Sequence, residues 1–185
     1  MPAPERTTTD AVIAAGRAIV EEGGAAALTM QAVAERVGVR APSLYKRVAG
    51  RDALLAAVVA ATLDELASEL AAAADAGTDA RGRLVAIAEA TRAFARRAPV
   101  GYGLVFGPPS PQAPDPAALA TAADPLLAAT RELVGDEDAL DAARLLTAWL
   151  HGFLAMDLAG AFRLGGDVDA AFAYGLDRIL AAIEP

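Results

Sequence analysis

The chain has 185 residues, of which 55% are hydrophobic and none is cysteine. This length suits one or two domains with a sizeable core, and the absence of thiols excludes disulfides and thiolate metal sites. The sequence contains no signal peptide and no apolar run of about 18 residues, so we expect a cytoplasmic protein without membrane association. The net charge of −8 disfavours a polyanionic partner unless basic residues are concentrated locally.

The composition and the spacing of apolar residues predict an all-α fold. Alanine, the best helix former, dominates, whereas the β-branched and aromatic residues that favour strands are sparse and scattered. The first helix is expected over residues 8–22, with apolar residues at helical spacing and a capping threonine at its start. Gly23 and Gly24 then end it.

Residues 28–48 predict two short helices joined by a tight glycine turn. Thr29 can cap the first helix by accepting a hydrogen bond from a backbone N–H, and Gly38 can end it in a left-handed conformation. The second helix is expected to start at about Pro42, because proline is well tolerated in the first turn. Leu44 then faces the first helix. The residues left pointing outward are Ser43, Tyr45, Lys46 and Arg47. This is a helix-turn-helix arrangement, in which the second helix enters a DNA major groove.

The charges are distributed unevenly along the chain. Residues 1–52 hold seven Lys or Arg and six Asp or Glu, a net charge of +1, whereas the remaining residues carry −9. Between Arg36 and Arg51 there are five basic residues and no acidic one. Because DNA affinity depends on local neutralisation of phosphates, a basic helix-turn-helix on an acidic body is compatible with DNA binding.

The helix-turn-helix segment also carries a recognisable order of residue types. They are Thr29, Val33-Ala34, Gly38-Val39, Leu44-Tyr45 and Arg51. This pattern resembles the DNA-binding domain of the TetR family of bacterial repressors. The resemblance implies a repressor that acts as a homodimer, with a double-stranded DNA operator as its partner and no cofactor.

Nine residues of this segment are expected to contact DNA. The expected phosphate contacts are Thr29, Tyr45, Lys46 and Arg51. The residues placed to reach base edges are Arg40, Ala41, Pro42, Ser43 and Arg47. Arginine can engage both major-groove acceptors of guanine, and small apolar groups can pack against thymine methyl groups.

The remainder of the chain predicts further helices. A long helix begins near Arg51 and keeps its apolar spacing until Gly77. The other helices are expected over residues 78–97, 99–106, 116–134, 138–164 and 167–183, with Gly165 and Gly166 ending the penultimate one. We therefore expect a helix-turn-helix domain over residues 1–52 and an effector-binding and dimerisation domain over residues 53–185.

The helix expected over residues 138–164 is apolar on every side between Leu145 and Met156, so two of its faces must be covered. We expect one face to line a ligand-binding core and the other to join the last helix in a two-fold symmetric, four-helix dimer interface. The expected interface residues are Leu150, Leu154, Leu158, Phe172, Leu176, Ile179, Leu180 and Ile183. Trp149, His151 and Gly152 resemble the tryptophan–histidine–glycine pattern of one TetR subgroup.

A small hydrophobic or aromatic effector is expected, because the candidate pocket residues are mostly apolar. They are Phe94, Tyr102, Phe106, Trp149, His151, Phe153 and Met156, and each is also compatible with plain core packing. One histidine and no cysteine cannot build a transition-metal site, so no metal is expected. The effector would release the repressor from DNA by binding more tightly to a conformation that does not fit the operator.

Two other classes of function stay open. An all-α protein–protein interaction module would keep this fold without binding DNA, although exposed Lys46, Arg47 and Arg51 disfavour it. An enzyme is disfavoured because the sequence lacks a phosphate-binding glycine loop, a nucleophile elbow and a metal-binding helix motif. Salt-sensitive binding to a promoter fragment would identify a regulator, and turnover of a small molecule would identify an enzyme.

Overall fold

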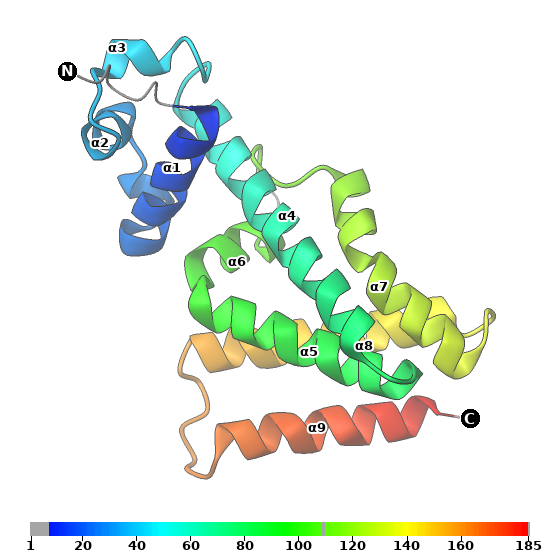
Figure 1. Cartoon of the computed structure of the whole chain (residues 1–185). Helices are drawn as coiled ribbons and strands as arrows, with labels where there is room; N and C mark the ends of the chain where they lie inside the picture. Colours follow the sequence, from blue (N-terminus) through cyan, green and yellow to red (C-terminus); the bar gives the residue numbers. More distant parts are fainter. Residues whose placement is uncertain (1–7, 109, 185) are drawn as a thin grey trace. The chain divides into compact units, whose positions relative to one another are not determined.

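The computed structural model describes residues 8–108 and 110–184, and this part of the chain contains helices and no strand (Figure 1). The all-α prediction is therefore confirmed. The helices are α1 (Thr9–Gly23), the 3-10 helix η1 (Ala25–Ala27), α2 (Met30–Arg36), α3 (Ala41–Leu44), α4 (Arg51–Ala76), α5 (Ala80–Arg97), α6 (Pro99–Phe106), α7 (Pro116–Val134), α8 (Ala139–Leu158) and α9 (Val168–Ile183). Within the described ranges, no helix combines the length and apolar character needed to cross a membrane.

Side-chain caps fix several helix starts where the sequence predicts them. The hydroxyl of Thr8 accepts a hydrogen bond from the N–H of Ala11 at 3.1 Å, and α1 begins at the next residue. At α9, the carboxylate of Asp167 accepts from the N–H of Asp169 at 2.8 Å. Such caps satisfy backbone donors that the first turn of a helix leaves without a partner.

The end of α8 differs from the prediction. The helix ends at Leu158, six residues before the expected end at Leu164. Gly160 adopts a φ of +60°, and the N–H of Ala161 donates back to the carbonyl of Met156 at 2.9 Å. This left-handed glycine stops the helix, so Gly165 and Gly166 lie in the loop before α9 and not at the end of α8.

The chain forms two compact units. Unit 1 contains residues up to Glu65 together with Ala98–Leu119, and unit 2 contains Leu66–Arg97 together with Ala120–Pro185. The continuous helix α4 therefore contributes its first part to unit 1 and its last part to unit 2. Helix α6 belongs to unit 1, the unit of the helix-turn-helix, while the functional division after residue 52 stays a prediction.

In unit 1, helices α1 to α3 and the start of α4 share one apolar core. The helix-turn-helix contributes Leu28, Val33 and Ala34, which are almost fully buried, and Leu44. Val100 and Leu104 of α6 pack against the same core. Burial of these side chains holds the short helices α2 and α3, which are too short to be stable alone.

In unit 2, helices α5, α8 and α9 contact one another in pairs. α8 and α9 run antiparallel and are joined by a loop over residues 159–167 (Figure 1). The largest fully buried side chains of the three helices are Leu84, Ile87 and Phe94 from α5, Leu146 and Leu154 from α8, and Leu180 from α9.

Candidate nucleic-acid interface and ligand-binding region

The turn of the helix-turn-helix is built as the sequence predicts. The hydroxyl of Thr29 accepts from the N–H of Ala32 at 3.0 Å, so Thr29 caps α2. Gly38 adopts a φ of +73° after α2, and the N–H of Val39 donates to the carbonyl of Ala34 at 2.9 Å. A side chain at position 38 would be strained in this conformation, which explains the glycine.

The second helix of the motif is shorter than its pattern suggested. α3 covers Ala41–Leu44, and the chain then continues as a turn through Arg47. The hydroxyl of Ser43 donates to the carbonyl of Arg40 at 2.6 Å, which closes the first turn. Leu44 and Val48 are buried as predicted and anchor this segment to unit 1.

Most of the expected DNA contacts are exposed on one continuous segment. The exposed residues are Thr29, Arg40, Pro42, Ser43, Tyr45, Lys46, Arg47 and Arg51, whereas Ala41 is half-buried. Tyr45 is 57% exposed, an unusual position for an aromatic side chain that could otherwise join the core. We call residues 40–47 the basic segment.

The basic segment holds charges that no ion pair neutralises among residues 8–108 and 110–184. Four basic residues form no ion pair within the described part of the chain, and three of them, Arg40, Lys46 and Arg47, lie here. The fourth is Arg163 in the α8–α9 loop. By contrast, Arg36 of α2 contacts Glu22 at 2.7 Å. Unpaired cations gathered on one surface attract a polyanion.

Arg51 has a different environment from the other expected phosphate contacts. Its Nε donates to the carbonyl of Leu28 at 2.9 Å, and its Nη2 donates to the carbonyl of Ala25 at 2.7 Å. Its Nη1 also contacts Asp52 at 3.2 Å. The guanidinium therefore fastens the connection between α1 and α2 to the start of α4. No local sequence pattern indicates this role.

A second contact in unit 1 that sequence analysis missed joins α1 to α6. The carboxylate of Glu21 accepts hydrogen bonds from the N–H of Gly101 at 2.6 Å and the N–H of Val100 at 3.2 Å. A Cβ at position 101 would lie 2.8 Å from the Glu21 carboxylate and 3.1 Å from Thr62. Glu21 thus caps the N-terminus of α6, where a negative charge is favourable, and Gly101 permits the close approach.

The expected effector residues fall into separate groups. Tyr102 and Phe106 are in α6, with ring centroids 4.9 Å apart, and burial raises the pKa of Tyr102. In unit 2, Phe94 is fully buried, whereas Met156 is 47% exposed. His151 is half-buried, and this burial lowers its pKa.

Trp149 and Phe153 do come together, in an aromatic cluster of unit 2. Their ring centroids are 5.7 Å apart, and both contact Phe172 of α9, at 5.4 and 5.2 Å. Trp149 also lies against Gly175, where a Cβ would approach the indole to 2.6 Å. These contacts are those of tight packing between α8 and α9.

An ionic network borders this aromatic cluster. The guanidinium of Arg92 lies 4.4 Å from the ring centroid of Phe172 and contacts Asp169 at 2.7 Å. Arg96 contacts Asp169 at 2.8 Å and Asp157 at 3.0 Å. The hydrogen bond from Arg96 lowers the pKa of Asp169 below its ordinary value. The network connects α5 to the end of α8 and the start of α9.

Most of the residues expected in the dimer interface lie inside unit 2. Five of its eight residues are buried inside unit 2 and offer little surface to a partner: Leu150, Leu154, Phe172, Leu176 and Leu180. Ile179 and Ile183 are half-buried, and Leu158 is 38% exposed. The hydrophobic stripes of α8 and α9 cover each other and α5. The large apolar residues that these helices expose are Leu140, Leu145, Met156, Leu158 and Tyr174.

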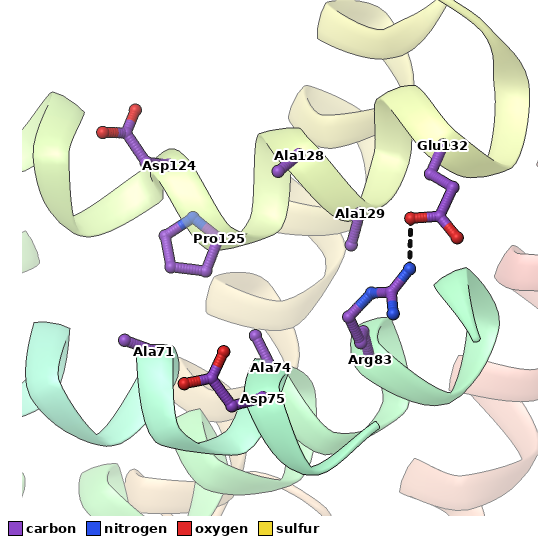
Figure 2. A pocket seen from close by; sticks show the side chains of 9 residues that line it. All are labelled: Ala71, Ala74, Asp75, Arg83, Asp124, Pro125, Ala128, Ala129 and Glu132. Carbon is purple, nitrogen blue, oxygen red and sulfur yellow. Dashed lines mark hydrogen bonds and ion pairs between the residues drawn. The ribbon is translucent and has the colours of Figure 1, made fainter. Parts of the chain in front are cut away.

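Unit 2 also contains an open groove of about 370 Å³ between α4 and α7 (Figure 2). Its lining residues are Ala71, Ala74, Asp75, Arg83, Asp124, Pro125, Ala128, Ala129 and Glu132. None of the expected effector residues is among them. Neither the alanines nor the carboxylates stand out in the sequence, because their helices are distant in the chain.

The sequence matches known families over most of its length. Residues 12–58 match the family "Bacterial regulatory proteins, tetR family", and residues 84–179 match "Tetracyclin repressor-like, C-terminal domain". The "HTH-type transcriptional regulator Rv1816" of Mycobacterium tuberculosis is 30% identical over 105 residues. That alignment covers 54% of this chain and 44% of the relative, so the chain spans less than half of the curated relative it matches.

Solved structures share the whole fold. A protein of unknown function from Rhodococcus sp. RHA1 has a TM-score of 0.84 over 100% of both chains, at 23% identity. A TetR variant from Acinetobacter baumannii AYE in complex with minocycline has a TM-score of 0.68 over 96% of both chains, at 26% identity. The second family match alone covers more than half of the sequence. The chain therefore belongs to the TetR family of bacterial regulatory proteins.

Proposed function

We propose that this protein is a transcriptional repressor that binds its operator as a homodimer and leaves it when a small hydrophobic or aromatic effector binds. The observation that carries the proposal is the basic segment, in which Arg40, Lys46 and Arg47 are exposed and have no ion-pair partner in the described chain. Their position in a helix-turn-helix supports contact with a DNA duplex.

Within the basic segment the residues have different proposed roles. Lys46, Tyr45 and Thr29 donate to phosphates, since the Thr29 hydroxyl accepts from Ala32 and keeps its own hydrogen for a phosphate oxygen. Arg40 and Arg47 reach base edges together with Ala41, Pro42 and Ser43. Arg51 contributes chiefly by holding the connection between α1 and α2 against the start of α4, because its guanidinium donates to the carbonyls of Leu28 and Ala25.

A dimer carries two helix-turn-helix segments, and both are needed to contact two major grooves one turn apart, about 34–36 Å. We propose that the exposed face of α8 forms the centre of the dimer contact. Along it, Leu145, Ala148, Gly152 and Met156 are exposed at helical spacing. A Cβ added at Gly152 would meet no atom of another element within 4 Å, so a partner helix can approach closely there. Tyr174 of α9 adds an exposed aromatic ring.

The effector is proposed to bind in the C-terminal part of the chain. The related TetR variant that binds minocycline supports a small-molecule ligand, and the resemblance of Trp149, His151 and Gly152 to one subgroup supports a C-terminal domain of the same kind. The effector can lower DNA affinity only by the difference between its own affinities for the DNA-binding conformation and for the conformation that does not fit the operator. Near-complete release requires a preference of about 10⁴-fold, or less where operator affinity is modest.

A footprint on the DNA that flanks the gene tests the proposal. We expect protection of two half-sites one helical turn apart, with affinity that falls steeply as salt rises, because phosphate contacts release counterions. Arg47→Ala should cost about 1–3 kcal/mol and relax specificity at one operator position. The matched control is Arg163→Ala, since Arg163 is the one unpaired arginine of the described chain outside the basic segment. Equal effects of the two substitutions, or no footprint at any salt, would refute the proposal.

A further inference from the structure

The groove between α4 and α7 has the size of a small-molecule site. Its volume of about 370 Å³ lies in the range of ligand pockets, which is about 300–1,000 Å³. Figure 2 shows the side chains of α7 on one side and those of α4 on the other, with Arg83 of α5 at one end. The groove is open to solvent, so a ligand can enter without a movement of the backbone.

The floor of the groove is apolar. Five of its nine lining residues are alanine or proline, and the ring of Pro125 faces α4 in Figure 2. Ala74 and Ala129 are almost fully buried, while Ala71 and Ala128 are exposed at its sides. Small side chains leave room for a flat ring or an alkyl chain, whose burial is favourable by about 25 cal/mol per Å².

The charge of the lining is negative. Arg83 forms an ion pair with Glu132 across the end of the groove, so these two charges offset each other (Figure 2). Asp75 and Asp124 have no ion pair in the described part of the chain. The Asp75 carboxylate lies beside the apolar floor, below the ring of Pro125, whereas that of Asp124 points outward from the rim (Figure 2).

We propose that this groove binds a small organic cation, an amine with an apolar body. The body lies on the alanine and proline floor, and the ammonium group lies beside the Asp75 carboxylate. An anion would face the unpaired carboxylate of Asp75, and the only guanidinium of the lining is already paired with Glu132. A neutral molecule would gain the apolar contacts alone. The proposal refines the class of effector, and only its regulatory consequence rests on the proposed repressor function.

A matched series of probes tests the charge preference directly, in the full chain and without DNA. The probes are 4-phenylbutylamine, 4-phenylbutan-1-ol and 4-phenylbutanoate, which share one apolar body and differ in charge. Backbone amide shifts in NMR titrations report both the affinity and the position of the ligand. We expect the amine to bind with a dissociation constant of about 1 mM, given the size of the probe, and to shift the amides of Ala128 and Ala129. The alcohol should bind about fivefold more weakly, and the carboxylate more weakly still.

Two pairs of variants locate the site. Asp75→Asn should weaken the amine about fivefold and leave the alcohol unchanged, because only a charged ligand loses an ion pair. Asp64→Asn is the control, an exposed aspartate of α4 outside the groove. Ala71→Leu should weaken both ligands by filling the groove, while Ala72→Leu, exposed and outside the lining, should not.

Several results would overturn the proposal. They are equal binding of the three probes, shifts confined to other residues, or equal effects of Asp75→Asn and Asp64→Asn. The repressor proposal is tested by a separate measurement, because the footprint on DNA is recorded without any ligand. Binding of the amine in the groove without protection of DNA would support this inference and contradict the proposed function.

Discussion

Arg47 and Arg51 are four residues apart and differ in what their guanidinium groups contact. Arg51 donates to the carbonyls of Leu28 and Ala25, whereas Arg47 is exposed and forms no ion pair in the described chain. Removing the Arg51 side chain takes the guanidinium donor from the part-buried Leu28 carbonyl and leaves the Ala25 carbonyl with the N–H of Leu28, at 3.3 Å. Arg51→Ala should therefore lower the free energy of unfolding by about 1–3 kcal/mol, measured by urea denaturation.

Arg47→Ala is the matched control for that experiment and should leave the urea midpoint unchanged. Arg51→Lys should recover only part of the loss, because an ammonium group cannot reproduce the fork of a guanidinium that donates to two carbonyls at once. If Arg51→Ala were as stable as the parent, the guanidinium would be free to serve as a phosphate contact alone.

Residues that act on their neighbours in sequence could be predicted, and residues that act at a distance could not. The caps formed by Thr29 and Asp167 follow from one side chain and the next turn of backbone. Glu21 instead caps a helix that starts almost 80 residues later. A glutamate near the end of an amphipathic helix has no feature that indicates such a partner, so only the folded chain reveals it.

At the scale of elements, the cap that Glu21 provides should hold the first turn of α6. Glu21→Ala removes the acceptor of the Gly101 and Val100 N–H groups, so both should exchange with solvent faster, by about tenfold. Hydrogen exchange followed by NMR measures this. Glu22→Ala is the neighbouring control, since Glu22 contacts Arg36 and not α6. Unchanged exchange at Gly101 in the Glu21 variant would show that α6 is held by its apolar contacts alone.

The ion pair between Arg96 and Asp169 should make the docking of α9 on α5 depend on pH. The pKa of Asp169 is lowered in the folded protein, chiefly by its hydrogen bond from Arg96. The folded state therefore gains stability from the ionised carboxylate above the unfolded pKa of about 3.9, and loses it as the pH falls through the lowered folded pKa.

Asp169→Asn should thus be less stable than the parent at pH 7, and the difference should shrink as the pH falls below about 4. Urea denaturation at a series of pH values measures it. Asp64→Asn provides the baseline, because Asp64 is exposed and forms no ion pair in the described chain. A difference that stayed constant between pH 7 and pH 3 would mean that the asparagine disturbs packing and that the charge plays no part.

Hydrophobic spacing predicted the helices well but did not show which apolar faces the chain buries against itself. The spacing of Leu150, Leu154, Phe172, Leu176 and Leu180 identifies one apolar stripe on each of α8 and α9, and both stripes are buried within unit 2. The more hydrophobic face goes to the chain's own core because burial there is largest. The face of α8 that stays exposed carries alanine, glycine and isolated large residues, and spacing alone does not distinguish such a face from ordinary solvent-exposed surface.

At the scale of the whole molecule, basic side chains that form ion pairs and basic side chains that form none lie in different parts of the described chain. The basic residues of α5 are paired with carboxylates, as Arg83 with Glu132 and Arg92 with Asp169. Unpaired cations concentrate in the basic segment, although the net charge is −8. The acidic remainder repels DNA, so a duplex is favoured at one place only. Net charge alone could not predict this, whereas the local run of basic residues did.

Bivalent binding then depends on the dimer contact proposed on α8. Gly152→Glu places a charged side chain on the exposed face of that helix, where an added Cβ meets no atom of another element within 4 Å. We expect the variant to keep its helix content by circular dichroism and to sediment as a monomer, because a partner helix would have to bury the new carboxylate. Its affinity for an operator with two half-sites should fall at least about 100-fold, since the second helix-turn-helix no longer binds as part of the same dimer.

Gly103→Glu is the control for the dimer experiment, because Gly103 is also helical, exposed and without neighbours within 4 Å of an added Cβ, but lies on α6. It should sediment as the parent does and bind the operator normally. If Gly152→Glu also remained dimeric, the contact would have to use another surface, such as that of Leu164, which is fully exposed in the α8–α9 loop. If the Gly152→Glu variant stayed dimeric and kept its operator affinity, the proposed interface on α8 would be wrong. The proposed DNA contact of the basic segment would not be affected.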